Sequence, residues 1–207
     1  MTLLLLLDYL GIALFAATGA LAASRRELDL VGFMFLAAVT GIGGGTVRDL
    51  ILDVPVFWVQ QPVHILICAG TAAVVYLTAH LVEYRYRLLM WLDAVALAAY
   101  AVFGAYKGLM VTGSPVLAVV MGMLTGTLGG IMRDVLANEP SVLLRKEIYV
   151  TAAMAGSVVF VAARLLELPP GIPALLGFAA ALGIRASALA FGWTLPTYRS
   201  RPGRDIS

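Results

Sequence analysis

Two stretches of the sequence decide the fold: TGIGGGTVRDLILDVP at residues 40–55 and TGTLGGIMRDVLANEP at residues 125–140. They align at a constant offset of 85, and seven of the sixteen aligned pairs are identical. The same offset pairs further residues nearer the start of the chain, namely Asp8 with Asp93, Gly19 with Gly104 and Val31 with Val116. Similarity at one fixed offset indicates an internal duplication, which sets the architecture of the whole chain.

The composition around these stretches is typical of a membrane protein. Of the 207 residues, 61% are hydrophobic and 13% are charged, and the mean hydropathy is +0.95. Because about a quarter of the residues of a soluble domain are charged, we expect one integral membrane domain over residues 1–207. The net charge of +2 does not indicate nucleic-acid binding, because Lys and Arg flank the apolar runs and do not form a soluble basic face.

The apolar runs predict seven membrane-spanning helices, since each crossing takes about 20 residues. The expected spans are 3–23, 30–52, 62–82, 88–110, 115–137, 148–166 and 171–192. The first repeat (about 3–84) and the second (about 88–168) each hold three spans, and an odd number of crossings turns the second copy upside down. The sequence therefore predicts an all-α inverted 3+3 repeat, a seventh helix and a basic tail at 198–207.

Basic residues follow alternate spans, and their positions predict the orientation. They are Arg25, Arg26, Arg85, Arg87, Arg145, Lys146, Arg199, Arg201 and Arg204. Short cytoplasmic loops keep an excess of Lys and Arg, so we expect the N-terminus outside and the C-terminus in the cytoplasm. The tail suits either contact with anionic membrane lipids or a disordered positive-inside anchor.

Glycine clusters lie near the middle of the second and fifth spans. Their members are Gly41, Gly43, Gly44 and Gly45 in the first repeat and Gly126, Gly129 and Gly130 in the second. Such glycines serve either close helix packing or a local opening of the helix, and we expect both spans to kink or unwind there.

Charged pairs follow both glycine clusters within one turn: Arg48–Asp49 and Arg133–Asp134. A charge in hydrocarbon costs several kcal/mol unless it faces water or a partner. The combination favours an ion pathway or gate, with a purely structural charge network as the alternative.

Neighbouring Arg and Asp side chains point about 100° apart on a helix. We therefore expect each to find its partner on another helix or in water, with the repeat-related Asp8 and Asp93 as candidates. Lys107, near the outer end of the fourth span, either snorkels to the interface or acts as an occluding or gating charge. Arg185, inside the seventh span, needs a polar partner that the sequence does not identify.

The remaining chemistry-bearing residues predict no enzyme, cofactor or metal site. Cys68 is the only cysteine and is expected to serve packing. His64 and His80 are sixteen residues apart, without a carboxylate placed to complete a metal site, and are expected to be interfacial. GIGGGT lacks the last glycine of a dinucleotide fingerprint and the lysine of a P-loop, and no HExxH or GxSxG occurs.

With GIGGGTVRDLILDVPVFWVQQP in the first repeat and GTLGGIMRDVL in the second, the chain resembles prokaryotic trimeric intracellular cation (TRIC) channels, a domain also labelled as a bacterial glycine transporter. The match extends through TGALAASRRELDLVG and GAYKGL to nearly all the chain. One departure is Leu128, which stands where the first repeat has Gly43, so the fifth helix has two adjacent glycines and is expected to open less.

The resemblance implies a homotrimer in a bacterial or archaeal plasma membrane. Each protomer would hold a pathway for K⁺, with Na⁺ also passing, lined largely by the second and fifth helices. The glycine clusters with Arg48, Asp49, Arg133 and Asp134 would form the kink and gate regions, and Lys107 would occupy a position associated with gating.

Three hypotheses of function follow. The first is a cation channel, in which exposed carbonyls of opened helices replace the hydration water of the ion. The second is a carrier of small amino acids such as glycine, because half-helix N-termini can hold a carboxylate. The third is a trimeric membrane scaffold that transports nothing.

Overall fold

The computed structural model describes residues 2–81, 85–143 and 147–196, and this part of the chain is helical. Its long elements are α1 (Thr2–Arg25), α2 (Leu30–Ile51), α4 (Val63–Thr78), α5 (Arg85–Thr112), α6 (Pro115–Leu136), α7 (Val150–Leu165) and α8 (Ile172–Phe191). A short helix, α3 (Phe57–Gln60), precedes α4, and a 3₁₀ turn (Ala79–Leu81) extends it.

Each of the seven predicted spans is present as a helix. Six helical segments are long and apolar enough to cross a membrane, one of them being α4 with its 3₁₀ turn, and α7 is a shorter apolar helix of 16 residues. Helix α3 was not predicted from the sequence, because it is only four residues long. The chain is thus an all-α, multi-pass membrane protein.

The two repeats fold alike in local detail as well as in helix order. Asp29 caps α2 by accepting a hydrogen bond from the Gly32 amide (2.8 Å), and Ser114, 85 residues later, caps α6 through the Leu117 amide (3.4 Å). After these helices the chain turns at Asp53 and Asn138, both with left-handed backbone (φ 52° and 51°). Asp and Asn tolerate that conformation better than most residues.

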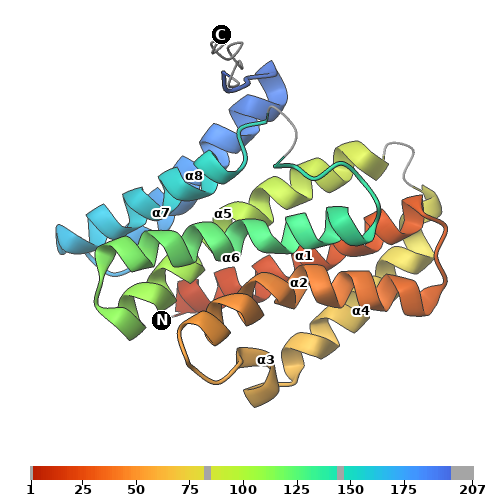
Figure 1. Cartoon of the computed structure of the whole chain (residues 1–207), viewed down its shortest axis with the longest axis horizontal. Helices are drawn as coiled ribbons and strands as arrows, with labels where there is room; N and C mark the ends of the chain where they lie inside the picture. The colour runs from red at the N-terminus through yellow and green to blue at the C-terminus, as the bar shows by residue number, and fades with distance from the viewer. Residues whose placement is uncertain (1, 82–84, 144–146, 197–207) are drawn as a thin grey trace, which may run out of the picture.

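The first helices of the two repeats, α1 and α5, form the centre of the bundle. Helix α5 packs against α1, α6, α7 and α8, while α2 and α4 pack against α1. In Figure 1, α7 and α8 lie side by side on one flank and α4 lies on the opposite flank, with α1, α2, α5 and α6 between them. Helix α8 is thus an addition to the 3+3 arrangement, packed on the second repeat.

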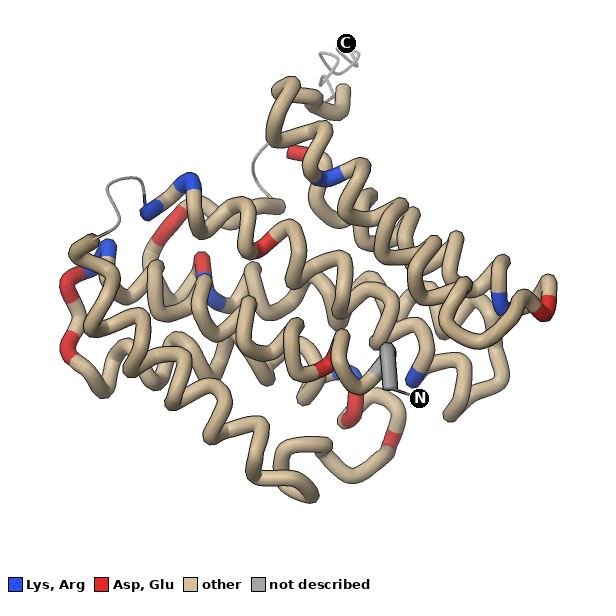
Figure 2. The backbone as a smooth tube through the Cα atoms, turned by 180° about the vertical axis from the view of Figure 1, so that it is seen from behind, with Lys and Arg blue, Asp and Glu red and all other residues tan. Residues whose placement is uncertain are grey.

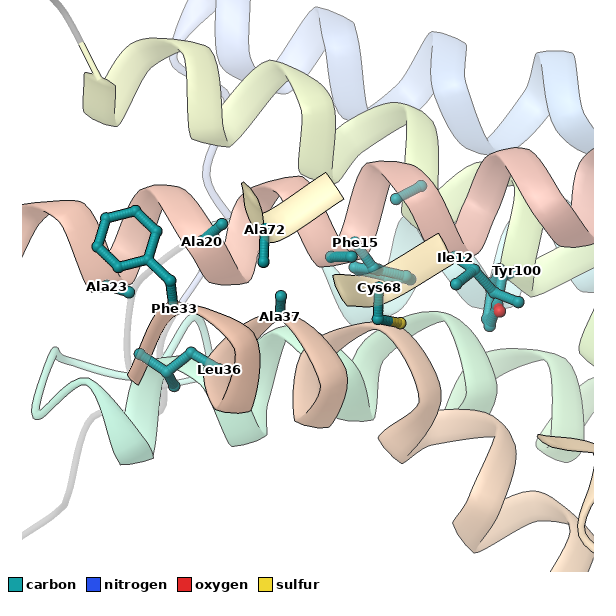
Figure 3. Packing of buried hydrophobic residues seen from close by; sticks show 12 residues of the cluster. Ile12, Phe15, Ala20, Ala23, Phe33, Leu36, Ala37, Cys68, Ala72 and Tyr100 are labelled. Carbon is teal, nitrogen blue, oxygen red and sulfur yellow. The ribbon is translucent and has the colours of Figure 1, made fainter. Parts of the chain in front are cut away.

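The core between α1, α2, α4 and α5 is built from small and aromatic side chains (Figure 3). Phe15 and Tyr100 meet edge to face, with ring centroids 5.4 Å apart, and Cys68 is buried beside them. Alanine side chains let the helices approach closely. Van der Waals packing at such contacts drives helix association in a membrane, because the surrounding lipid is as apolar as the side chains and the hydrophobic effect contributes little. Cys68 therefore lies in the packing environment that the sequence predicts.

Helices α2 and α6 cross at their glycines. A Cβ atom on Gly44 would lie 2.6 Å from the carbonyl oxygen of Thr125, and one on Gly129 would clash in the same way with the carbonyl oxygen of Thr40. Both helices are continuous across these residues. The predicted unwinding is therefore wrong for this structure, because the glycines provide close packing; a kink that keeps the helix intact stays a prediction.

Three basic residues gather at one end of the bundle. Arg25 pairs with Glu139 (2.9 Å), Arg26 donates to the Asn138 carbonyl (2.5 Å), and Arg85 donates to Ser24 (3.0 Å). The C-terminal ends of α1 and α6 therefore lie together, as expected if the basic residues that follow alternate spans share one side of the membrane. Of the other residues used to predict orientation, Arg145, Lys146 and the tail at 198–207 lie outside the described residues.

Candidate functional site

Apart from Arg185, the buried charges of the described residues form two groups toward opposite ends of the central helices, with an uncharged stretch between them (Figure 2). The Arg133 cluster consists of Arg133, Asp134, Asp93, Thr18 and Tyr149. The Arg48 cluster consists of Arg48, Asp49, Lys107, Asp8 and His64. At offset 85, Arg48, Asp49, Asp8 and His64 correspond to Arg133, Asp134, Asp93 and Tyr149.

In the Arg133 cluster every donor group of the guanidinium is used. Nη1 donates to Asp93 (2.7 Å) and to Thr18 (2.9 Å), while Nε and Nη2 donate to Asp134 (3.0 and 2.9 Å). The Tyr149 hydroxyl donates to Asp93 at 3.5 Å. Only 2% of the Arg133 side chain is exposed, so this network compensates the burial of three charges. Asp93 is thus one of the two partners that the sequence proposed.

In the Arg48 cluster a single carboxylate serves two cations. Asp49 accepts from Arg48 Nε (2.8 Å) and from Lys107 Nζ (2.9 Å). Asp49 is fully buried, whereas a quarter of the Lys107 side chain is exposed. Lys107 thereby links the second repeat to the charged pair of the first, so it is an ion-pair partner and not a free snorkelling side chain.

The expectation that each charge finds its partner on another helix is confirmed for Arg133 through Asp93, but it is wrong in excluding the neighbouring Arg and Asp, which pair with each other in both repeats. Arg48 pairs with Asp49 (2.8 Å) and Arg133 pairs with Asp134 (2.9 Å). Cβ directions 100° apart do not prevent contact, because the long arginine side chain bends round the helix toward the shorter carboxylate.

The second oxygen of each carboxylate holds the following loop. Asp49 Oδ2 accepts from the Phe57 amide (3.0 Å), and Asp134 Oδ2 accepts from the Val142 amide (3.0 Å). Both amides lie eight residues further along the chain. The conserved spacing between the two repeats thus fixes the loop at each membrane face onto the end of its charged helix.

The two clusters differ at the remaining arginine nitrogen. Among the described residues, Arg48 Nη1 is buried without a hydrogen-bond partner. Phe103 stands where the Arg133 cluster has Thr18, and the Arg48 guanidinium lies 5.4 Å from the Phe103 ring and 5.8 Å from the Phe57 ring. The Arg48 cluster therefore relies on weaker cation–π contacts where its counterpart has hydrogen bonds.

Asp8 takes a different partner from that of Asp93. Its Oδ2 lies 3.4 Å from Nε2 of His64, which is 97% buried. The prediction that His64 is interfacial is therefore wrong, because the chain before α4 turns its ring inward against Tyr9 and Phe57. His80 is exposed.

The glycines predicted to line a pathway have different surroundings. Gly44 and Gly129 form the helix crossing, and Gly126 lies against the backbone of α5. Gly45 faces the Phe57 ring and Gly130 faces the Tyr149 hydroxyl, so both adjoin the charged clusters. Gly43, in contrast, is half-buried and faces the flexible side chain of Met132.

Three members of the clusters, Thr18, Tyr149 and His64, were not predicted from the sequence. Each falls at a repeat-related position where the two copies carry different residues, so a search for identities passes over them. A comparison of positions 85 residues apart that also accepts two different polar residues would have found His64 paired with Tyr149.

The partner of Arg185 is Glu147, whose carboxylate lies 2.7 Å from Nη2, and Nη1 also donates to the Ile148 carbonyl (3.1 Å). Within residues 2–81, 85–143 and 147–196, no group of three or more His, Cys, Asp or Glu side chains is placed to hold a metal ion.

A family model described as glycine transporter matches the chain twice, over residues 5–80 and 90–165. The chain belongs to this family. The second match begins 85 residues after the first, which is the offset of the internal repeat.

Solved structures and curated relatives agree with this assignment. The chain is similar to a TRIC channel orthologue from Rhodobacter sphaeroides (48% identity, TM-score 0.91, covering 93% of this chain and all of that chain). It is also similar to a prokaryotic TRIC channel solved in 0.5 M KCl (25% identity, TM-score 0.87, covering 94% and 99%). Among curated proteins, the inner membrane protein YadS of Escherichia coli (strain K12) is 40% identical over 198 residues, covering 93% of this chain and 94% of the relative.

The resemblance to prokaryotic TRIC channels is thus confirmed, and the chain has the fold of that group. These structural neighbours are ion channels and not enzymes, which agrees with the absence of enzyme motifs from the sequence.

Proposed function

We propose that this chain is a channel for monovalent cations, K⁺ with Na⁺ also passing, and that each protomer of a homotrimer holds its own pathway. The observation that carries the proposal is the placement of two buried charge clusters at opposite ends of one glycine crossing, between α2 and α6. The TRIC channels with the same fold are cation channels by description. Buried arginines beside the path disfavour divalent cations.

Gating is assigned to the glycine faces of α2 and α6 together with the Arg48 cluster. Glycines at Gly44 and Gly129 leave no side chains to interlock, so the two helices can shift against each other with little steric resistance. Of the ion-paired residues Arg48, Asp49 and Lys107, Lys107 has the most exposed side chain. Its release from Asp49 would move a charge within the membrane field, which is worth about 2.3 kcal/mol per 100 mV for a full crossing.

The second candidate is a carrier of glycine or another small amino acid. Two observations favour it: the description of the family model and the unpaired Nη1 of Arg48, which offers a carboxylate a charged donor. For either function we propose a bacterial or archaeal plasma membrane, which the name of the inner membrane protein YadS supports. The N-terminus is proposed to lie outside and the C-terminus in the cytoplasm, from the positions of the basic residues.

The deciding experiment compares K⁺ flux with glycine uptake in the same proteoliposomes. A channel gives K⁺ flux that rises with the gradient without saturating, while glycine uptake stays at the level of empty vesicles. Saturable glycine uptake, competed by alanine or serine, with no K⁺ flux would overturn the channel proposal. Absence of both, in a correctly assembled trimer, would favour the scaffold.

Variants separate gating from folding. Lys107→Gln is expected to shift the voltage at which half the channels open in planar bilayers, since it removes one charge of the Arg48 cluster. Arg164→Gln removes one charge from an exposed site at the end of α7 and serves as the matched control. Arg133→Ala tests the other cluster in the flux assay.

A further inference from the structure

His64 is held in a position that fixes one of its protons. Its Nδ1 lies 2.8 Å from the carbonyl oxygen of Gln61. A carbonyl oxygen can only accept, so Nδ1 carries a hydrogen and donates it. The state of the second nitrogen, Nε2, then decides the charge of the ring.

Nε2 faces a carboxylate. It lies 3.4 Å from Asp8 Oδ2, within ion-pair distance but without the alignment of a hydrogen bond. A bare Nε2 would hold its lone pair close to an ionised carboxylate in a buried site, which is repulsive. A second proton, on Nε2 or on the Asp8 carboxyl, removes that repulsion. The contact as it stands is therefore that of a pair holding one proton in addition to the one on Nδ1.

The second repeat shows where Asp8 would go without that proton. Its counterpart Asp93 receives the Nη1 donor of Arg133 at 2.7 Å. The same nitrogen of Arg48, the counterpart of Arg133, has no hydrogen-bond partner among the described residues. One carboxylate thus has two possible partners, and one of them is vacant.

We propose that His64 and Asp8 form a proton-binding site, and that loss of the shared proton transfers Asp8 from His64 to Nη1 of Arg48. His64 then acts as a positioning residue for Asp8, and the ligand of the site is H⁺. The Arg48 cluster then has two arrangements. In one, Asp8 lies beside His64 and Arg48 Nη1 has no partner; in the other, Asp8 accepts from Arg48 Nη1, as Asp93 accepts from Arg133 Nη1.

The titratable and charged groups around this site come from each helix packed on it. Helix α1 supplies Tyr9 beside the His64 ring, and α2 supplies Arg48 and Asp49. Helix α5 supplies Lys107 and Tyr100, whose hydroxyl donates to the Gly41 carbonyl at 3.4 Å. Arg48 and Lys107 are both paired with Asp49. Among the groups at this site, the proton is therefore assigned to the His64–Asp8 pair.

The proton changes the charge that a cation meets at this end of the molecule. Arg48 and Lys107 against Asp49 leave a formal charge of +1. With the shared proton bound, His64 and Asp8 add nothing, whereas without it they add −1 and make the group neutral. If the chain is the cation channel proposed above, we therefore expect K⁺ flux to rise with pH; this expectation rests on that proposed function. The rise is about fourfold, for a unit charge about 10 Å from the ion at an effective dielectric constant of about 40.

The proton site is tested without transport by ¹⁵N spectra of labelled histidine. The chain has two histidines, and His80→Gln assigns the signals. We expect the His64 signals of the wild type to change between pH 5.5 and 8.5 as the shared proton leaves, and Asp8→Asn to keep the neutral ring with hydrogen on Nδ1 throughout. Identical His64 spectra in wild type and Asp8→Asn across pH 5.5–8.5 would overturn the proton site.

The consequence for flux is tested in proteoliposomes over the same pH range. His64→Gln is expected to abolish the pH dependence of K⁺ flux, while the exposed matched control His80→Gln keeps it. A pH dependence that survives in His64→Gln would overturn the transfer of Asp8 as its cause. A wild-type protein without any K⁺ flux would overturn the channel proposal alone, because the spectra do not depend on transport.

Discussion

Arg48 and Arg133 occupy the same position in the two repeats but differ in what their removal leaves behind. Without Arg133, Asp93 and Asp134 lose their shared cation and remain buried as two neighbouring carboxylates. Without Arg48, Asp49 keeps Lys107 and the Phe57 amide. The two arginines therefore contribute differently to the free energy of unfolding, although they occupy equivalent positions in the repeats.

Arg133→Met is expected to lower the free energy of unfolding by about 3 kcal/mol, because it breaks a buried pair on one side only. Arg48→Met is expected to cost less, about 1.5 kcal/mol, the lower end of the range for a hydrogen bond to a charged group, because Asp49 keeps its other cation. Thermal unfolding of the detergent-purified protein, followed by size exclusion, compares the two variants. Equal losses of melting temperature would contradict this assignment of partners.

The charged residues of the site were predictable from the sequence, but their pairing was not. Duplicated Arg–Asp pairs inside apolar helices indicated buried charges, because a charged side chain within a membrane span must face the interior of the bundle and not the lipid. Which carboxylate meets which cation depends on side-chain bends and on loops that fold back, such as the turn that brings the Phe57 amide to Asp49. The inward turn of His64 depends on the same loop, which no local pattern encodes.

At the scale of helices, the glycine clusters are contact surfaces in this structure. Gly44 and Gly129 each meet a backbone carbonyl of the opposite helix. The sequence predicted both the helices and the repeat because hydrophobic length and a constant offset can be read from the sequence without knowing any contact. It could not choose between packing and unwinding, since glycine permits both.

Gly44→Ala and Gly129→Ala are each expected to destabilise the protein by about 2 kcal/mol, because an added methyl group must push two backbones apart. The same separation should change K⁺ flux in proteoliposomes. Gly183→Ala in α8 is the matched control, since an added Cβ there meets nothing within 4 Å, and helix propensity favours alanine. Loss of stability in Gly183→Ala equal to that in the two crossing variants would contradict the packing role.

At the scale of the whole molecule, the inverted repeat sends equivalent loops to opposite faces of the membrane. Asp53 and Asn138 are repeat-related, exposed and in the same left-handed conformation. Asn138 lies where Arg26 donates to its carbonyl, at the end where basic residues gather. The inverted fold therefore requires that these two residues face different compartments, and the distribution of basic residues predicts that Asn138 faces the cytoplasm.

Cysteine labelling tests this topology directly, because Cys68 is the only native cysteine and is buried. In a Cys68→Ala background, Asp53→Cys is expected to react with a membrane-impermeant maleimide in spheroplasts. Asn138→Cys is expected to react only after the membrane is opened. The two sites are matched in exposure and backbone, so a difference in their labelling reports sidedness. Labelling of both from the same side would refute the inverted repeat, whereas an exchange of the two sides would keep the fold and reverse only its orientation.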